Sequence, residues 1–320
     1  MTAAREDRAA EGRPARDNRQ QERKARRMRV SISVTNFSWP SGPGGLSAEL
    51  VRLLRAADQA GVDTVWVADH LLQADPTAGP DETEMLEAYT TLGFLAGQTE
   101  RVRLGTMVTP VALRPPALLV KTVTTLDVLS GGRAWLGIGA GYHAEEAQAL
   151  DLPLPPTAER FERLEETLQV ALRMWAGDET PFEGKHYRLR HPAGSPGPAQ
   201  RPHPPILVGG AGERRTLRLV ARYADACSLP DIPDGGRTVR HKLAVLAGHC
   251  ADAGRPYEAI EKTLGTRLEA GEPGDQFVRR CRASAALGIQ HVVLITPGPW
   301  KPERLAVLAA AIPELREVQP

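Results

Sequence analysis

From Arg29 onward, short apolar runs rich in β-branched residues alternate with longer amphipathic runs, and this alternation restricts the possible folds. A short buried run followed by a helical pattern is typical of β-α units around a parallel sheet. The short runs number eight, at residues 30–35, 64–68, 102–108, 134–139, 205–209, 226–229, 262–268 and 291–296. A helical pattern follows each of them, at residues 47–60, 89–98, 116–129, 157–175, 214–223, 238–252, 274–287 and 301–311. Eight such units predict an α/β fold, a (β/α)8 TIM barrel, with a doubly wound open sheet as the alternative.

Glycine and proline positions support this division of the chain. Gly61 follows the first helical pattern, where a left-handed C-cap residue belongs, and Pro116 opens the third. Residues 177–204, between the fourth helix and the fifth strand, are rich in Pro, Gly and His and are too long for an ordinary connection. We expect an insertion there that forms a lid or a wall of the pocket.

Residues 1–27 differ from the rest of the sequence. They carry nine Lys and Arg side chains against five acids, and few apolar residues other than alanine. Such a segment buries too little surface to offset the entropy of ordering, so we expect a disordered charged extension. Met28 is then a candidate start of the chain, and residues 28–320 form a single barrel domain. A basic arm that binds nucleic acid is the alternative for residues 1–27.

Composition narrows the choice of partner and compartment. The formal net charge of +1 provides no overall field that would attract nucleic acid or an anionic membrane, so a small molecule is the expected partner. The sequence contains no apolar run of roughly 18 to 20 residues, and its first residues do not follow the pattern of a signal peptide, so we expect neither a membrane span nor export. Cys227, Cys250 and Cys281 are far apart and form no CxxC pair, which favours a reducing, cytoplasmic location.

Catalytic residues of a barrel lie at the carboxyl ends of its strands. The second predicted strand ends in Asp69 and His70. An imidazole at this position titrates near neutral pH and can give or take one proton, which makes His70 the catalytic candidate. A histidine that bonds only to its own loop is the alternative.

Two glycine-rich segments follow other strands. The fourth strand continues into Ala140, Gly141 and Tyr142, where small residues allow a flat ligand to lie against the backbone. Its glycine spacing lacks the downstream acid of a dinucleotide-binding turn. The fifth strand ends in the glycine loop, which consists of Gly209, Gly210, Ala211 and Gly212.

The glycine loop leads directly into a predicted helix. Backbone N–H groups and the helix dipole favour an anion at such a position, so the glycine loop is the predicted phosphate site, with a tight turn as the alternative. We predict no metal site, because His186, His191 and His203 have no carboxylate at ligand spacing.

Taken in order, these segments resemble the luciferase-like monooxygenase superfamily, and within it the F420-dependent oxidoreductase branch. The matching segments are residues 65–70, 99–110, 126–133, 136–141 and 204–213. The resemblance implies that a non-proline cis peptide near Met107 and Val108, followed by Thr109, lies behind an isoalloxazine-type ring. It also implies a cofactor phosphate on the glycine loop, His70 beside the ring, Asp69 as the orienting neighbour of His70, and a homodimer.

One residue departs from the resemblance. Sugar-phosphate dehydrogenases of the superfamily carry a glutamate where this chain has Tyr142, and a tyrosine is a poor base near neutral pH. We therefore expect hydride transfer between F420 and another small organic substrate. The alternatives are an FMN-dependent monooxygenase that uses molecular oxygen, a flavin-binding protein without turnover, and a metal-dependent hydrolase.

Overall fold

Each of the predicted apolar runs forms a parallel strand in the computed structural model, which describes residues 27–269 and 271–320. The strands are β1 (Arg29–Val34), β2 (Thr64–Val67), β3 (Arg103–Thr106), β4 (Thr109–Pro110), β5 (Ala134–Gly139), β8 (Ile206–Gly209), β9 (Ala226–Pro230), β10 (Glu261–Arg267) and β11 (His291–Ile295). Both β3 and β4 pair with β5, so they are two parts of one barrel strand. Since β11 pairs with β1, the sheet closes into the predicted (β/α)8 barrel.

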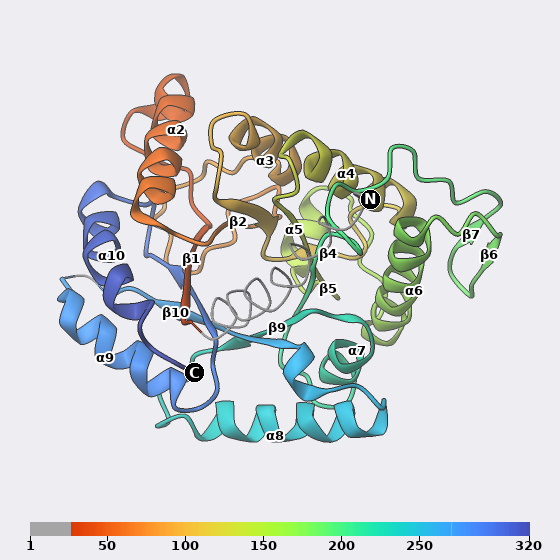
Figure 1. The fold of residues 1–320 in the computed structure, drawn as a ribbon. Helices are drawn as coiled ribbons and strands as arrows, with labels where there is room; N and C mark the ends of the chain where they lie inside the picture. The colour runs from red at the N-terminus through yellow and green to blue at the C-terminus, as the bar shows by residue number, and fades with distance from the viewer. Residues whose placement is uncertain (1–26, 270) are drawn as a thin grey trace, which may run out of the picture.

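The helices surround the strands (Figure 1). They are α2 (Gly42–Ala60), α3 (Ala88–Ala96), α4 (Pro116–Leu129), α5 (Ala144–Ala149), α6 (Thr157–Ala176), α7 (Thr216–Tyr223), α8 (Arg237–Asp252), α9 (Gly274–Ala285) and α10 (Pro302–Leu315), with a 3-10 turn at Tyr257–Ala259. The predicted C-cap is confirmed, because Gly61 has a left-handed backbone (φ 87°). Within residues 27–269 and 271–320, no helix is long and apolar enough to cross a membrane.

Bulky side chains fill the inside of the barrel. Trp66 and Trp135 pack with a ring-centroid distance of 5.6 Å. A Cβ atom at Gly105 would lie 2.8 Å from the Trp66 ring, so the glycine in this strand allows the indole to fit. Since this packed interior leaves no pore, a ligand can enter only at the ends of the strands.

A group of polar side chains is buried at the amino ends of the strands. His291 bonds Ser31 Oγ through Nε2 and Glu261 Oε1 through Nδ1, both at 2.5 Å. Next to it, Arg103 forms an ion pair with Asp63 at 2.5 Å. We call these five residues, together with Arg29, the basal cluster; Arg29 pairs with Glu261.

The long connection between α6 and β8 contains a small hairpin, β6 (Phe182–Glu183) and β7 (Arg188–Leu189). The C-terminal end of this connection packs at the amino ends of the strands. There the Gln200 amide donates to Asp127 and to the carbonyl of Ala134 at the start of β5. No side chain of this segment lines the cavity at the carboxyl ends of the strands, so the structure does not support the expected lid or wall of that cavity. Apart from Arg27, the predicted N-terminal extension lies outside the described residues.

Candidate active site

A cavity of about 510 Å³ lies at the carboxyl ends of the strands. Most of its lining is apolar, and the polar side chains that reach it are His70, Tyr142, His143, Glu146, Thr216 and Ser228. The predicted cofactor-binding residues that it brings together are Met107, Val108, Ala140, Gly141, Tyr142, Gly209, Gly210, Ala211 and Gly212. Thr109 and Asp69 are fully buried and do not line it.

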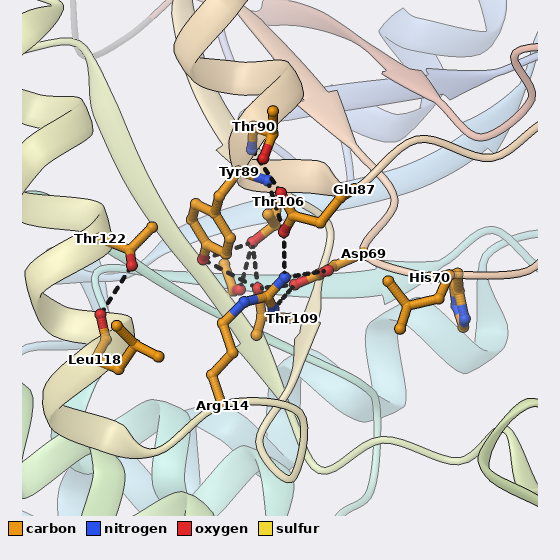
Figure 2. A network of polar contacts seen from close by, with 12 residues as sticks. Asp69, His70, Glu87, Tyr89, Thr90, Thr106, Thr109, Arg114, Leu118 and Thr122 are labelled. Atoms are coloured by element: carbon orange, nitrogen blue, oxygen red, sulfur yellow. Dashed lines mark hydrogen bonds and ion pairs between the residues drawn. The ribbon is translucent and has the colours of Figure 1, made fainter. Parts of the chain in front are cut away.

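The carboxylate of Asp69 points away from His70, into a buried polar network (Figure 2). Arg114 donates to both of its oxygens, at 2.6 and 3.1 Å, and Thr109 Oγ1 donates to one of them at 2.7 Å. Arg114 also bonds Glu87 at 2.5 Å, and the Glu87 carboxylate accepts the backbone N–H groups that open α3. Asp69 therefore ties the ends of β2 and β4 to α3, instead of orienting His70 as we expected.

Tyr89 completes this network. Its hydroxyl lies 3.0 Å from Thr109 Oγ1 and 3.4 Å from Thr106 Oγ1, and the Arg114 guanidinium lies over its ring at 4.9 Å. Burial, and then the charge of Asp69, raise the pKa of Tyr89 to about 12. The phenol stays protonated at every physiological pH and acts as a structural group.

His70 obtains its carboxylate partner from another element. Its Nδ1 lies 2.9 Å from Oε2 of Glu146, which stands on the short helix α5. Neither α5 nor the role of Glu146 was predicted from the sequence. The available signal was the spacing of His143 and Glu146, because the His143 side chain caps α5 by accepting the backbone N–H of Glu146.

Glycines at two strand ends make room for Val108. A Cβ atom at Gly139 or at Gly209 would lie 2.9 Å from a methyl group of Val108. The Met107–Val108 peptide bond is cis, in agreement with what the resemblance implied. Val108 thus forms the floor of the cavity between β5 and β8.

The glycine loop precedes α7, and Gly210 has a φ of 111°, a conformation that favours glycine. Arg215, at the N-cap of α7, makes no side-chain capping bond. No side chain caps this helix end beside the cavity, which favours an anionic group there, although the N–H of Leu217 already donates to the carbonyl of Gly212. Together with a volume in the range of ligand pockets, these features fit a flat ring with a phosphate-bearing side chain.

Comparison with known proteins agrees with this arrangement. The sequence profile of the luciferase-like monooxygenase family matches residues 28–312. The chain belongs to this family. The predictions of a luciferase-like scaffold and of an oxidoreductase are thereby confirmed.

Among its luciferase-like relatives is the F420-dependent glucose-6-phosphate dehydrogenase of Nakamurella multipartita, which is 34% identical over 76% of this chain and 70% of its own length. Two solved structures share the fold. The F420-dependent tetrahydromethanopterin reductase of Methanopyrus kandleri has a TM-score of 0.74 and 16% identity, covering 91% of this chain and 99% of that one. The monooxygenase RslO1 of Streptomyces bottropensis has a TM-score of 0.71 and 20% identity, covering 91% and 98%.

Proposed function

We propose that this luciferase-like protein is an F420-dependent oxidoreductase that transfers a hydride between the deazaflavin and a small organic substrate. The observation that carries the proposal is the single cavity that joins Val108, the glycine loop and His70 at the barrel mouth. The F420-dependent relatives at about 30% identity support the choice of cofactor. When bound, F420 supplies hydride chemistry at its deazaflavin ring.

Residues of this chain would hold the cofactor at two places. The glycine loop and the N-terminus of α7 would bind its phosphate, and Thr216 adds a hydroxyl that lines the same part of the cavity. Met107 and Val108 would support the ring from behind, with Ala140 and Gly141 allowing close approach. His70, at the cavity wall, would give or take the proton that accompanies the hydride.

The lining of the cavity argues for a substrate without a phosphate group. Within residues 27–269 and 271–320, no Lys or Arg side chain lines the cavity, so a phosphorylated sugar would find no cationic side chain there in addition to the backbone site proposed for the cofactor phosphate. Tyr142, which occupies the place of the glutamate in sugar-phosphate dehydrogenases, is 72% exposed and stands at the rim. We therefore propose an uncharged, partly apolar substrate, in spite of the glucose-6-phosphate dehydrogenases among the relatives.

An FMN-dependent monooxygenase that uses molecular oxygen is the second candidate. Its support is the monooxygenases among the proteins of the same fold. Both cofactors carry a tricyclic ring and a phosphate, so the same residues could hold either one.

Titration of the full-length protein with F420 and, separately, with FMN tests the proposal. Quenching of chromophore fluorescence should give micromolar binding of F420 and binding of FMN at least tenfold weaker, which corresponds to about 1.4 kcal/mol. A preference for FMN would instead support the monooxygenase. If neither binds, the proposed role of the glycine loop is wrong. His70→Ala should bind the cofactor as the wild type does but lose about 100-fold or more in turnover.

We also propose a homodimer in a reducing, cytoplasmic setting. The support for the setting is that Cys227, Cys250 and Cys281 are all buried and unpaired. The support for the dimer is an exposed stripe along α4, defined by Leu118, Thr122, Thr125 and Leu129, of which only Thr122 is half-buried. Leu118 and Leu129 are 56% and 74% exposed, and each threonine hydroxyl bonds a backbone carbonyl of its own helix, as Figure 2 shows for Thr122.

A further inference from the structure

Two imidazoles line the cavity, and the proposed function uses only one of them. His70 follows β2, and His143 stands at the N-cap of α5. Their ring centroids are 5.5 Å apart, with the ring planes inclined by 70°. A neutral imidazole has one donor and one acceptor nitrogen, so the chemistry of this pair depends on which nitrogen of each ring carries the proton.

Glu146 holds the first ring. Its Oε2 lies 2.9 Å from Nδ1 of His70, and its Oε1 accepts the backbone N–H groups of Leu71 and Leu72 at 2.6 and 3.0 Å. The Glu146 side chain is only 5% exposed. Three bonds to one segment therefore hold the carboxylate in a single orientation.

The Glu146 carboxyl group is ionised. Burial opposes this charge, but the hydrogen bonds from Leu72 N–H, the His70 ring and Leu71 N–H outweigh burial, and the pKa of Glu146 lies below its ordinary value. An ionised carboxylate only accepts hydrogen bonds, so the bonded Nδ1 of His70 must carry a proton. In the neutral ring, Nε2 is then the nitrogen with a free lone pair.

The second ring has the opposite arrangement. Nδ1 of His143 accepts the backbone N–H of Glu146 at 3.1 Å. A nitrogen that accepts a hydrogen bond carries no proton, so the proton of the neutral His143 ring must be on Nε2.

We propose that Glu146 is a positioning residue that holds His70 and His143 in opposite tautomers. Its side chain sets the tautomer of His70, and its backbone N–H sets that of His143. The cavity thereby receives an acceptor nitrogen from His70 and a donor N–H from His143. Such a pair matches a hydroxyl group, which donates to one partner and accepts from the other.

The match to a hydroxyl group indicates a substrate class, and this part of the inference rests on the proposed function. An alcohol would donate its hydroxyl proton to Nε2 of His70 and accept a hydrogen bond from Nε2–H of His143, and F420, when bound, would supply the acceptor for the hydride that the alcohol carbon must lose. In the reverse direction, a carbonyl compound would gain the hydride at carbon and the proton at oxygen.

Glu146→Gln tests the positioning role. The amide oxygen must face the N–H groups of Leu71 and Leu72, because an amide NH₂ there would meet two donors. The amide NH₂ then faces His70 and forces Nδ1 to become the acceptor, which moves the ring proton to Nε2. The backbone N–H of Glu146 is unchanged, so His143 should keep its tautomer and serve as an internal reference.

Nitrogen-15 NMR of histidine-labelled, full-length protein reports the tautomers directly, with His70→Ala and His143→Ala providing the assignments. We expect the Nδ1–H form of His70 and the Nε2–H form of His143 in the wild type, and a switch of His70 alone in Glu146→Gln. The exposed neighbour Glu145→Gln, which loses the same charge, should change neither ring. An Nε2–H form of His70 in the wild type, or no switch in Glu146→Gln, would overturn the proposal.

Turnover provides a separate measurement. In Glu146→Gln, kcat should fall about 100-fold to 1000-fold while KM changes little, because the acceptor nitrogen is lost and the cavity is not. The NMR experiment needs no cofactor. Failure to bind F420 or FMN would therefore refute the proposed function and leave the proposal about the tautomers unaffected. Unchanged tautomers in Glu146→Gln beside intact F420 binding would refute only the role of Glu146.

Discussion

At the scale of single residues, the adjacent side chains Asp69 and His70 serve different purposes. His70 lines the cavity, whereas Asp69 is fully buried and bonded to Arg114 and Thr109. Arg114 is itself only 15% exposed and is the cation that compensates the charge of Asp69. A buried carboxylate that loses its cation is strongly destabilising, so this pair should be sensitive to substitution.

Arg114→Met should lower the free energy of unfolding by about 3 to 5 kcal/mol, because it leaves the Asp69 charge buried and uncompensated. Arg222→Met removes an ion pair with Glu165 whose arginine is 44% exposed, and should cost less than about 1 kcal/mol. Urea unfolding of both variants measures the difference. Equal costs for the two variants would contradict the prediction, as would a double variant Arg114→Met, Asp69→Asn no more stable than Arg114→Met alone.

At the scale of elements, the basal cluster joins β1, β2, β3, β10 and β11 at the end of the barrel opposite the cavity. Burial lowers the pKa of His291 to about 3, so its ring is neutral in the folded protein. Burial opposes the charge of Asp63, but Arg103 and Arg29 outweigh it and keep its pKa below the ordinary range. Both groups therefore make the folded barrel bind fewer protons in acid than the unfolded chain does.

This difference in proton binding sets the sign of the pH dependence. The unfolded chain takes up a proton at His291 near pH 6.5, whereas the folded protein resists it down to about pH 3. The contribution of the neutral His291 ring to the free energy of unfolding is complete above pH 6.5. It is lost as the pH falls below that value, with a slope that approaches about 1.4 kcal/mol per pH unit. Between pH 7 and pH 5 the wild type should lose about 2 kcal/mol through His291.

His291→Gln should remove this part of the pH dependence, because glutamine does not titrate. Urea unfolding from pH 7.5 to pH 4.5 should show a smaller slope in His291→Gln, whatever its stability at neutral pH. His191→Gln, at a side chain that is 68% exposed, should keep the wild-type slope. Parallel curves for His291→Gln and the wild type would show that another group controls the acid sensitivity.

At the scale of the whole molecule, the exposed stripe of α4 predicts association of two copies. A pair of leucines three turns apart, with threonine methyl groups between them, leaves apolar surface in water. Light scattering after gel filtration should give the mass of a dimer for the wild type. Leu118→Asp combined with Leu129→Asp should give a monomer, because two buried charges would oppose the interface.

The control for this prediction is Leu150→Asp. Leu150 is also exposed, at 40%, but follows α5 and lies outside the stripe of α4. We expect this variant to keep the mass of the wild type. A dimer that survives both stripe substitutions would place the interface elsewhere.

Much of the barrel could be predicted from the sequence, because its signals are local. Strands and helices follow from the periodicity of apolar residues, and all eight predicted units are present. The ends of the strands then place His70, Tyr142 and the glycine loop on one face of the barrel, and the cavity does contain them. The short helix α5 was not predicted, because a helix of six residues shows too little periodicity of apolar residues.

Only the tertiary structure decided which side chains act together. The partner of His70 is Glu146, 76 residues away, and the partner of Asp69 is Arg114, 45 residues away. Sequence adjacency suggested that Asp69 would orient His70, but neighbouring residues at a strand end point in opposite directions. The sequence thus determined the scaffold and the position of the site, whereas closure of the barrel determined the contacts that give each residue its role.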